Sequence, residues 1–306
     1  MDKKALTLTI LAYMTSNYGE GLGNVSSVQK VYKNGEIYST RSRESLKNAI
    51  MVQSGMYDDL VVEVNGAPAQ KKINPKLNAS NCRALEGGYM NTKVKVEKDE
   101  LTFIRNSSFY LTDAISCAPF LNETRFHNNL HLAKTFAKEN DLNVQNDSKG
   151  DNKVGLMPYN YEFEKTMRVY SITFDLEMIG KDENFKNAEA KNIEKAERVN
   201  SILEAVQNLN LIVKGNLDNA EPIFIVGGLS KRKTHVFENV ISVKNGNLAI
   251  TDDLLYKISK GYKVGLLRGD NFKNENEIMG KLNPVSVDQF FDELESDINK
   301  YYGVEK

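Results

Sequence analysis

Apolar and polar residues alternate near the start of the chain, which is the pattern of a β-strand with one buried face. Between Ala5 and Tyr13, the apolar positions are Leu6, Leu8, Ile10 and Ala12. Residues 17–24 follow with three glycines and two asparagines, which permit positive φ angles and let another backbone come close. We therefore predict a strand that runs into a loop.

The same periodicity analysis places the remaining core elements. Residues 170–178 alternate and residues 222–226 are apolar, which predicts two more strands. Apolar residues at helical spacing predict helices at 43–50 and 193–209, and Thr40 or Ser42 can cap the first helix. A hairpin at Asn245-Gly246, a helix at 252–258, a strand at 262–267 and a carboxy-terminal helix at 287–301 complete the chain.

In chain order, the core elements are strand, helix, strand or ribbon, strand, helix and strand. This order predicts an α+β fold with the βαββαβ plan of a ferredoxin-like or RRM-like domain. Two weakly periodic regions interrupt it, a segment at about 64–110 with a β-ribbon turning near Lys98-Asp99, and a segment at 112–161 with a short helix at 130–137. We expect residues 1–306 to form a single domain with these two insertions.

Composition excludes several classes of protein. Of the 306 residues, 41% are hydrophobic and 26% are charged, which is ordinary globular usage. No apolar run is long enough for a membrane span, so we expect no membrane contact and a cytoplasmic location. Cys82 and Cys117 form no CxxC pair, so neither a zinc site nor a disulfide framework is expected. We predict no cofactor.

The net charge of −1 is unevenly distributed. Residues 1–110 carry 15 Lys/Arg and 11 Asp/Glu, a local charge of +4, whereas residues 111–306 carry 25 and 30, a local charge of −5. Bulk positive charge therefore cannot hold a nucleic acid. A phosphate-binding surface would have to be a local stripe, with acidic surface elsewhere.

Two segments near the amino terminus are candidate phosphate contacts. The free N–H groups and positive dipole end of the first helix favour anions, and Arg43 offers forked donors. The alternative is an ordinary solvated helix start. In the glycine-rich loop, side-chain amides could approach a ribose-phosphate backbone, although such loops are usually just turns. The residues proposed here are Asn17, Asn24, Arg41, Ser42, Arg43 and Lys47.

Two further segments combine cations with a turn or a ribbon. Three consecutive cations after the predicted strand at 222–226 raise the local potential, although a solvated charge run is equally compatible with the pattern. The ribbon at 93–105 carries cations suited to phosphate. The candidates are Gly227, Gly228, Lys231, Arg232 and Lys233 in the first segment, and Lys93, Lys95 and Arg105 in the second.

Catalytic groups are weaker candidates. His127 and His131 stand four residues apart, but no third ligand accompanies them, so we predict no metal site. Asp175 and Glu177 share one face of a strand, as exposed acids on a sheet commonly do, and the further carboxylates of a metal nuclease are missing. The base-stacking signature of RRM domains is also absent.

Several segments of the chain resemble a known protein family. ALTLTILA followed by NYGEGLGN and SRESLKNAI, and later TDAISCAP, YSITFDLEM, AERVNSILEAVQNL and PIFIVGG, are similar to the DevR-type backbone proteins of type I-B CRISPR systems. The resemblance implies an RRM-like palm with inserted finger and thumb elements, and Lys93–Arg105 is the thumb candidate. Residues 143–152 depart from the family in being polar and weakly patterned.

The resemblance also implies a function. We expect a non-catalytic subunit of the type I effector complex (Cascade) that polymerises head-to-tail along crRNA. The guide would pair with target DNA, and other Cas subunits would be partners. The main alternative is a ferredoxin-like endonuclease that processes CRISPR RNA with His127, His131 or His235 as general base. A third possibility is a scaffold that binds only protein.

Overall fold

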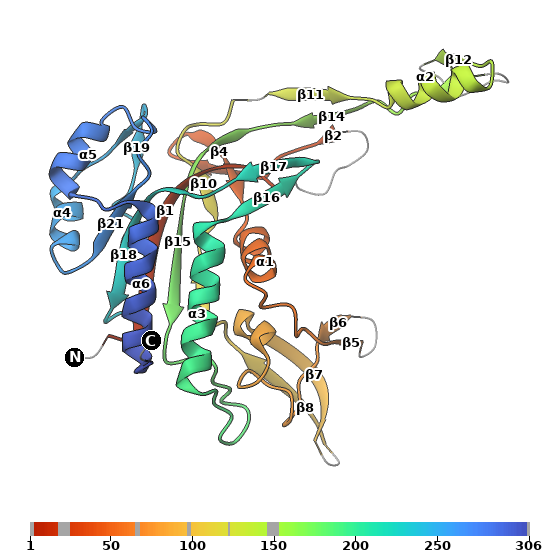
Figure 1. Cartoon of the computed structure of the whole chain (residues 1–306). Coiled ribbons are helices and arrows are strands. Elements are labelled where there is room, and N and C mark those ends of the chain that lie inside the picture. The colour runs from red at the N-terminus through yellow and green to blue at the C-terminus, as the bar shows by residue number, and fades with distance from the viewer. Residues whose placement is uncertain are drawn as a thin grey trace.

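The computed structural model describes residues 3–17, 25–64, 68–96, 99–121, 123–145 and 153–304 (Figure 1). An eight-stranded sheet forms its centre, with the order β21-β18-β1-β15-β10-β4-β3 and with β9 as a second partner of β15. The strands are β1 (Ala5–Thr15), β3 (Lys30–Lys33), β4 (Glu36–Arg41), β9 (Phe109–Leu111), β10 (Ala114–Ser116), β15 (Lys165–Asp175), β18 (Pro222–Ser230) and β21 (Lys263–Leu266).

The core elements follow the predicted order. Along the chain they are β1, α1 (Arg43–Gln53), β9 and β10, β15, α3 (Asn192–Gln207) and β18. In the sheet, β18, β1, β15 and β10 are neighbours, and all of these pairs are antiparallel. This is the strand order of a βαββαβ unit. The α+β prediction is confirmed.

Helices α1, α3 and α6 (Val287–Tyr302) cover one face of the sheet (Figure 1). Leu6, Leu8 and Ile10 of β1 point into this core, as their spacing of two predicts. They are joined there by Ile202 of α3 and Phe290 of α6. Burial of such side chains stabilises a fold by roughly 1.5–3 kcal/mol each.

The opposite face of the sheet is polar near one end of β1. Thr7 and Thr9 form hydrogen bonds with Thr173 and Ser171 of β15, at 3.2 and 2.7 Å between hydroxyl oxygens. A carboxy-terminal segment packs over part of this face through a second core. Its elements are β19 (Val243–Lys244), β20 (Asn247–Leu248), α4 (Asp252–Ile258) and α5 (Glu275–Leu282).

The first predicted insertion, 64–110, lies between α1 and β9. It contains a two-stranded ribbon as predicted, although residues 97 and 98 of its turn lie outside the described residues. A smaller strand pair and a 3-10 turn precede the ribbon. The elements are β5 (Val62–Val64), β6 (Ala69–Lys71), η1 (Arg83–Gly87), β7 (Tyr89–Val96) and β8 (Asp99–Arg105).

The second predicted insertion was 112–161; its first residues include β10 of the central sheet, and the residues after β10 form an arm that extends away from the sheet and carries α2 at its far end (Figure 1). The arm begins after β10 and returns to β15. It consists of β11 (Thr124–His127), α2 (Leu130–Glu139), β12 (Asn143–Gln145), β13 (Lys153–Gly155) and β14 (Tyr159–Glu162), and β2 (Val25–Ser26) pairs with β14. Helix α2 includes the predicted helical segment 130–137.

A hairpin of β16 (Asn210–Val213) and β17 (Asn216–Asn219) was not predicted. Its two-residue turn, Lys214-Gly215, has positive φ at both positions, as tight hairpins require. Within the described ranges, every helix is too short or too polar to cross a lipid bilayer.

Candidate functional site

The start of α1 is already occupied by protein oxygen atoms. Ser42 is the N-cap, and its hydroxyl accepts a hydrogen bond from the Ser45 amide. The Ser42 amide donates to Asn17 Oδ1, and the Arg43 amide donates to Asp113 Oδ1, each at 2.8 Å. The Asp113 carboxylate therefore takes the position that we predicted for phosphate. In this structure, Asn17 and Ser42 tie the end of β1 to the helix.

Two of the predicted cations near this helix are not available to a ligand. Arg41 is 6% exposed, and its Nη1 donates to the Thr15 carbonyl. Lys47 Nζ donates to the Gly87 carbonyl at 3.0 Å and to Ser107 Oγ at 2.7 Å. Burial and the nearby charge of Lys71 lower the pKa of Lys47 to about 8. Both side chains stabilise the fold through these hydrogen bonds and are not part of the candidate site.

Arg105 has a structural position as well. It is buried, and its guanidinium donates to the Glu86 carboxylate at 3.1 Å and to backbone carbonyls such as Leu85 and Met178. Arg198 of α3 pairs with the same carboxylate at 2.8 Å. This network joins the first insertion to α3. The side chains of Lys93 and Lys95, and all of Asn24, lie outside the described residues.

Gly227 and Gly228 do not form a phosphate-binding loop, because β18 continues through Ser230. A Cβ atom at Gly227 would lie 2.0 Å from the Thr7 carbonyl oxygen, so close packing of β18 on β1 requires glycine there. Past the strand, Lys231 and Arg232 are exposed. Lys233 forms ion pairs with Asp175 at 2.8 Å and Glu177 at 3.0 Å, so the two acids are part of a surface ion-pair cluster.

The predicted cations do not form one continuous track. Arg41 contacts Thr15 at one end of β1, whereas Lys231 follows Ser230, which pairs with Ala5 at the other end. Eleven strand residues separate these ends by roughly 33 Å at about 3.3 Å per residue. The structure therefore separates two groups of cations that a single local stripe of positive charge would have brought together. Arg43 remains exposed in the first group, and Lys231 and Arg232 in the second.

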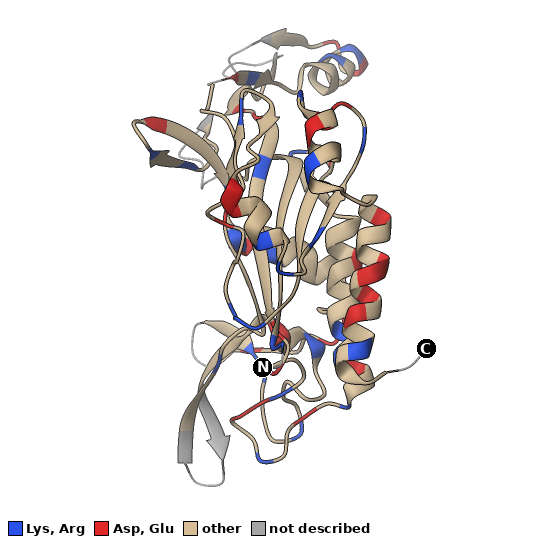
Figure 2. Ribbon diagram, turned by 90° about the vertical axis from the view of Figure 1, so that its left-hand side faces the viewer, with Lys and Arg blue, Asp and Glu red and all other residues tan. Residues whose placement is uncertain are grey.

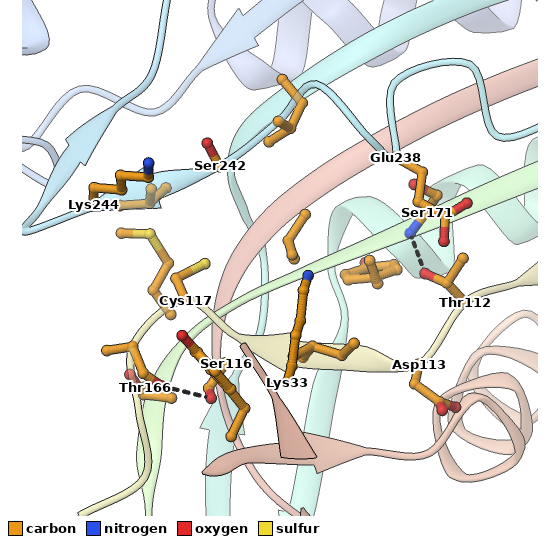
Figure 3. Close-up of a pocket in the computed structure, with 18 of the residues that line it drawn as sticks. Lys33, Thr112, Asp113, Ser116, Cys117, Thr166, Ser171, Glu238, Ser242 and Lys244 are labelled. Atoms are coloured by element: carbon orange, nitrogen blue, oxygen red, sulfur yellow. Dashed lines mark hydrogen bonds between the residues drawn. The ribbon is translucent and has the colours of Figure 1, made fainter. Parts of the chain in front are cut away.

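A groove on the polar face of the sheet is the better candidate. It has a volume of about 1000 Å³ and lies between β10 and β15 on one side and the 235–246 segment on the other. Arg43, Lys33 and Lys244 line it, and the Lys33 side chain points into it (Figure 3). Two carboxylates, Asp113 and Glu238, lie along the same groove.

Neutral polar groups make up much of the remaining lining. They comprise asparagine amides and serine and threonine hydroxyls, which can donate hydrogen bonds to phosphate and sugar oxygens without adding charge. These residues are Asn34, Asn239, Asn245, Asn271, Thr112, Ser116, Thr166, Ser171 and Ser242. The sequence predicts Asn245-Gly246 only as a hairpin turn, because nothing local indicates that it lines a groove.

The charge distribution separates this groove from an acidic surface. Acidic residues gather along α6, on the helix-covered side of the sheet (Figure 2). The groove lies on the opposite face, where Met167, Val169 and Ser171 of β15 form part of its wall. The slightly negative molecule thus gathers a group of acids on the helix-covered side, while Asp113 and Glu238 remain beside the groove cations and Glu44 pairs with Arg43 at 2.8 Å.

The histidines do not come together in one site. His235 lines the groove, and its Nδ1 lies 2.9 Å from the Thr173 hydroxyl, while burial lowers its pKa. His127 is in the arm, where its Nε2 forms a hydrogen bond with the Tyr161 hydroxyl, and His131 is on α2. Among the described residues, no three His, Cys, Asp or Glu side chains gather as metal ligands.

A buried arginine fixes the root of the arm. Arg168 is fully buried and donates to the carbonyls of Met14 and Ser39 and to the Ser16 hydroxyl. It also pairs at 2.9 Å with Glu164, which lies between β14 and β15. Burial, offset in part by Glu164, lowers the Arg168 pKa to about 10. The end of β1, β4 and the base of the arm are therefore joined through one guanidinium.

Solved structures share this fold, among them two that are described as CRISPR complexes. One, described as a CRISPR RNA-guided surveillance complex, has a TM-score of 0.53 and 11% sequence identity, and the match covers 96% of this chain and 99% of that chain. The other, described as the same kind of complex before nicking, has a TM-score of 0.55 and 9% identity, with 96% and 100% covered. The fold is thus that of a CRISPR surveillance complex subunit.

A comparison of the sequence with protein families is more specific than the comparison of folds. Residues 6–247 match the family described as CRISPR-associated negative auto-regulator DevR/Csa2. The chain belongs to this DevR/Csa2 family, and the resemblance found in its sequence is confirmed. No curated protein matches the chain by sequence.

Proposed function

We propose that this protein is a crRNA-binding backbone subunit of a type I-B CRISPR effector complex and that it holds the guide without cleaving it. The match of residues 6–247 to the DevR/Csa2 family carries the proposal. The complexes that share the fold are described as RNA-guided, which supports guide RNA as the ligand. In this proposal, the subunits polymerise head-to-tail along crRNA, the guide pairs with target DNA, and other Cas subunits complete the assembly.

The groove supplies chemistry for the RNA backbone. Three cations and a row of amides and hydroxyls suit phosphate and ribose, and they carry no sequence information. This matches a subunit that must accept any guide. We propose Lys33, Arg43 and Lys244 as phosphate contacts, and Lys231 and Arg232 as a separate contact near the other end of β1. The segment 64–110 with its β7–β8 thumb, and the segment 112–161 as finger, remain our proposed insertions.

The decisive experiment is to co-express the chain with a CRISPR array and to sequence the RNA that copurifies. We expect guide-length crRNA with many different spacers. Copurification of no RNA, with a low ratio of absorbance at 260 to 280 nm, would instead indicate a scaffold that binds only protein.

A salt titration tests the groove itself. For single-stranded RNA, the slope of log affinity against log salt is about −0.7 for each phosphate contact, so replacing Lys33, Arg43 and Lys244 by alanine should make the slope shallower by about 2. A matched variant that replaces the exposed cations Lys76, Lys281 and Lys300 should leave it unchanged. If the slope became equally shallow in both variants, the groove assignment would be disproved.

One observation keeps the endonuclease alternative testable. His235 lines the groove, and its lowered pKa leaves it neutral at pH 7, as a general base must be. Incubation of repeat RNA with wild type and His235→Ala separates the two functions. We expect intact RNA in both reactions, whereas cleavage that is lost in the variant would overturn the non-catalytic role.

A further inference from the structure

One face of the β11–β14 ribbon carries aromatic and basic side chains in register. Arg125 pairs with Tyr161, and His127 pairs with Tyr159. Because alternate residues of a strand point to the same side, these four side chains share one face. Phe126 pairs with Asn160 and therefore lies on the opposite face.

The three rings on the shared face are packed together. The centroids of His127 and Tyr159 are 5.5 Å apart with an interplanar angle of 26°, and those of Tyr159 and Tyr161 are 6.1 Å apart at 30°. The hydrogen bond of 3.1 Å between His127 Nε2 and the Tyr161 hydroxyl holds the imidazole in this arrangement. The cluster is thus ordered before any ligand binds, which reduces the entropy lost on binding.

The outer rings of this cluster remain accessible. Tyr161 is 2% exposed and forms the base of the cluster, whereas Tyr159 is 39% exposed and His127 is also exposed. Beside them, the Arg125 guanidinium lies 3.3 Å from the centroid of the Phe163 ring. Exposed rings next to a cation are the combination with which proteins hold single-stranded nucleic acid, because every base can stack on a ring.

We propose that the His127–Tyr159 face of the ribbon is a stacking site for one unpaired base of the guide RNA, with Arg125 supplying positive charge beside it. The site rests on the proposed function for its ligand, but it is separate from the groove, whose lining contains none of these residues. It is carried on the arm rather than on the sheet (Figure 1). Any base fits such a site, so the lack of sequence preference is retained.

The experiment compares an oligouridine with an abasic oligonucleotide of the same length and backbone, measured by fluorescence anisotropy. One stacked base should make the oligouridine bind wild type roughly 10-fold more tightly than the abasic strand. The double variant His127→Ala/Tyr159→Ala should lose this preference and keep its affinity for the abasic strand. Phe126→Ala, which removes a 60% exposed ring from the other face, should keep the preference.

Each alternative result has a definite meaning. Equal affinity of wild type for both strands would overturn the stacking site alone, whereas failure to bind either strand would overturn the proposed function with it. A double variant that changes its oligomeric state and not its base preference would mean that this face contacts protein, against our proposal. Should the variants fail to fold, quenching of a 2-aminopurine base by wild type supports the site and unchanged fluorescence refutes it.

Discussion

Arg105 donates a hydrogen bond to the Glu86 carboxylate at 3.1 Å, and the two side chains are 1% and 0% exposed. A charge in such a position is tolerated only because its partners are in place. Removal of one partner of a buried pair costs about 3–5 kcal/mol. Arg105→Ala should therefore lower the free energy of unfolding by about that amount in a urea titration. Arg43→Ala, which removes an exposed guanidinium, should leave the unfolding midpoint unchanged.

The glycine at position 227 is a second test of how tightly the sheet is built. Alanine there would place a Cβ atom against the Thr7 carbonyl, and β18 would have to move away from β1. We expect Gly227→Ala to destabilise the protein by about 1–3 kcal/mol, as overpacking does. Gly280 provides the control, because it lies in α5 with open space around it. Gly280→Ala should stabilise by about 0.5–1 kcal/mol.

Lys47 should make the free energy of unfolding change with pH in the alkaline range. Burial and repulsion from Lys71 lower its folded-state pKa to about 8, below the ordinary value of 10.5. Between these values, the unfolded chain binds the proton and the folded chain does not, so this lysine makes stability rise with pH. Below pH 8 its charge opposes folding fully. Urea titrations from pH 7.5 to 10 should show a smaller rise in Lys47→Met than in wild type, and identical curves would contradict the prediction.

His235 acts in the same direction at lower pH. Burial lowers its pKa below the ordinary 6.5, so protonation favours the unfolded chain. The contribution of neutral His235 to stability is fully present above pH 6.5 and is lost as the pH falls below that value. Thermal melts between pH 7 and pH 5 should show a smaller loss of stability in His235→Gln than in wild type. A larger loss in the variant would mean that other groups dominate.

Periodicity predicted the core well, for a physical reason. Strands β1 and β15 are buried on both faces over most of their length, but their apolar side chains concentrate on the face that the helices cover. Helix α3 buries one stripe, so each of these elements carries a clear period. The sequence could not reveal that the polar face of β15 would be partly covered. That covering depends on a segment about sixty residues later, whose His235 Nδ1 lies 2.9 Å from the Thr173 hydroxyl of β15.

The site was harder to predict than the fold, because residue type does not determine burial. Lys47 and Arg105 resemble ordinary surface cations in the sequence, yet their partners are a carbonyl forty residues away and a carboxylate in an aperiodic turn. The aromatic face of the arm depends on a strand register that brings together residues 34 positions apart, such as His127 and Tyr161. Among the predicted cations whose side chains the structure describes, Arg43, Lys231, Arg232 and Lys233 are exposed.

The buried guanidinium of Arg168 has a mechanical consequence. Because one rigid group is bonded at once to the end of β1, to β4 and to Glu164 at the root of the arm, the arm cannot swing at its root without breaking several buried contacts. In the assembly that we propose, successive copies would present their arms at a constant pitch, so that the protein itself would set the spacing along the bound strand.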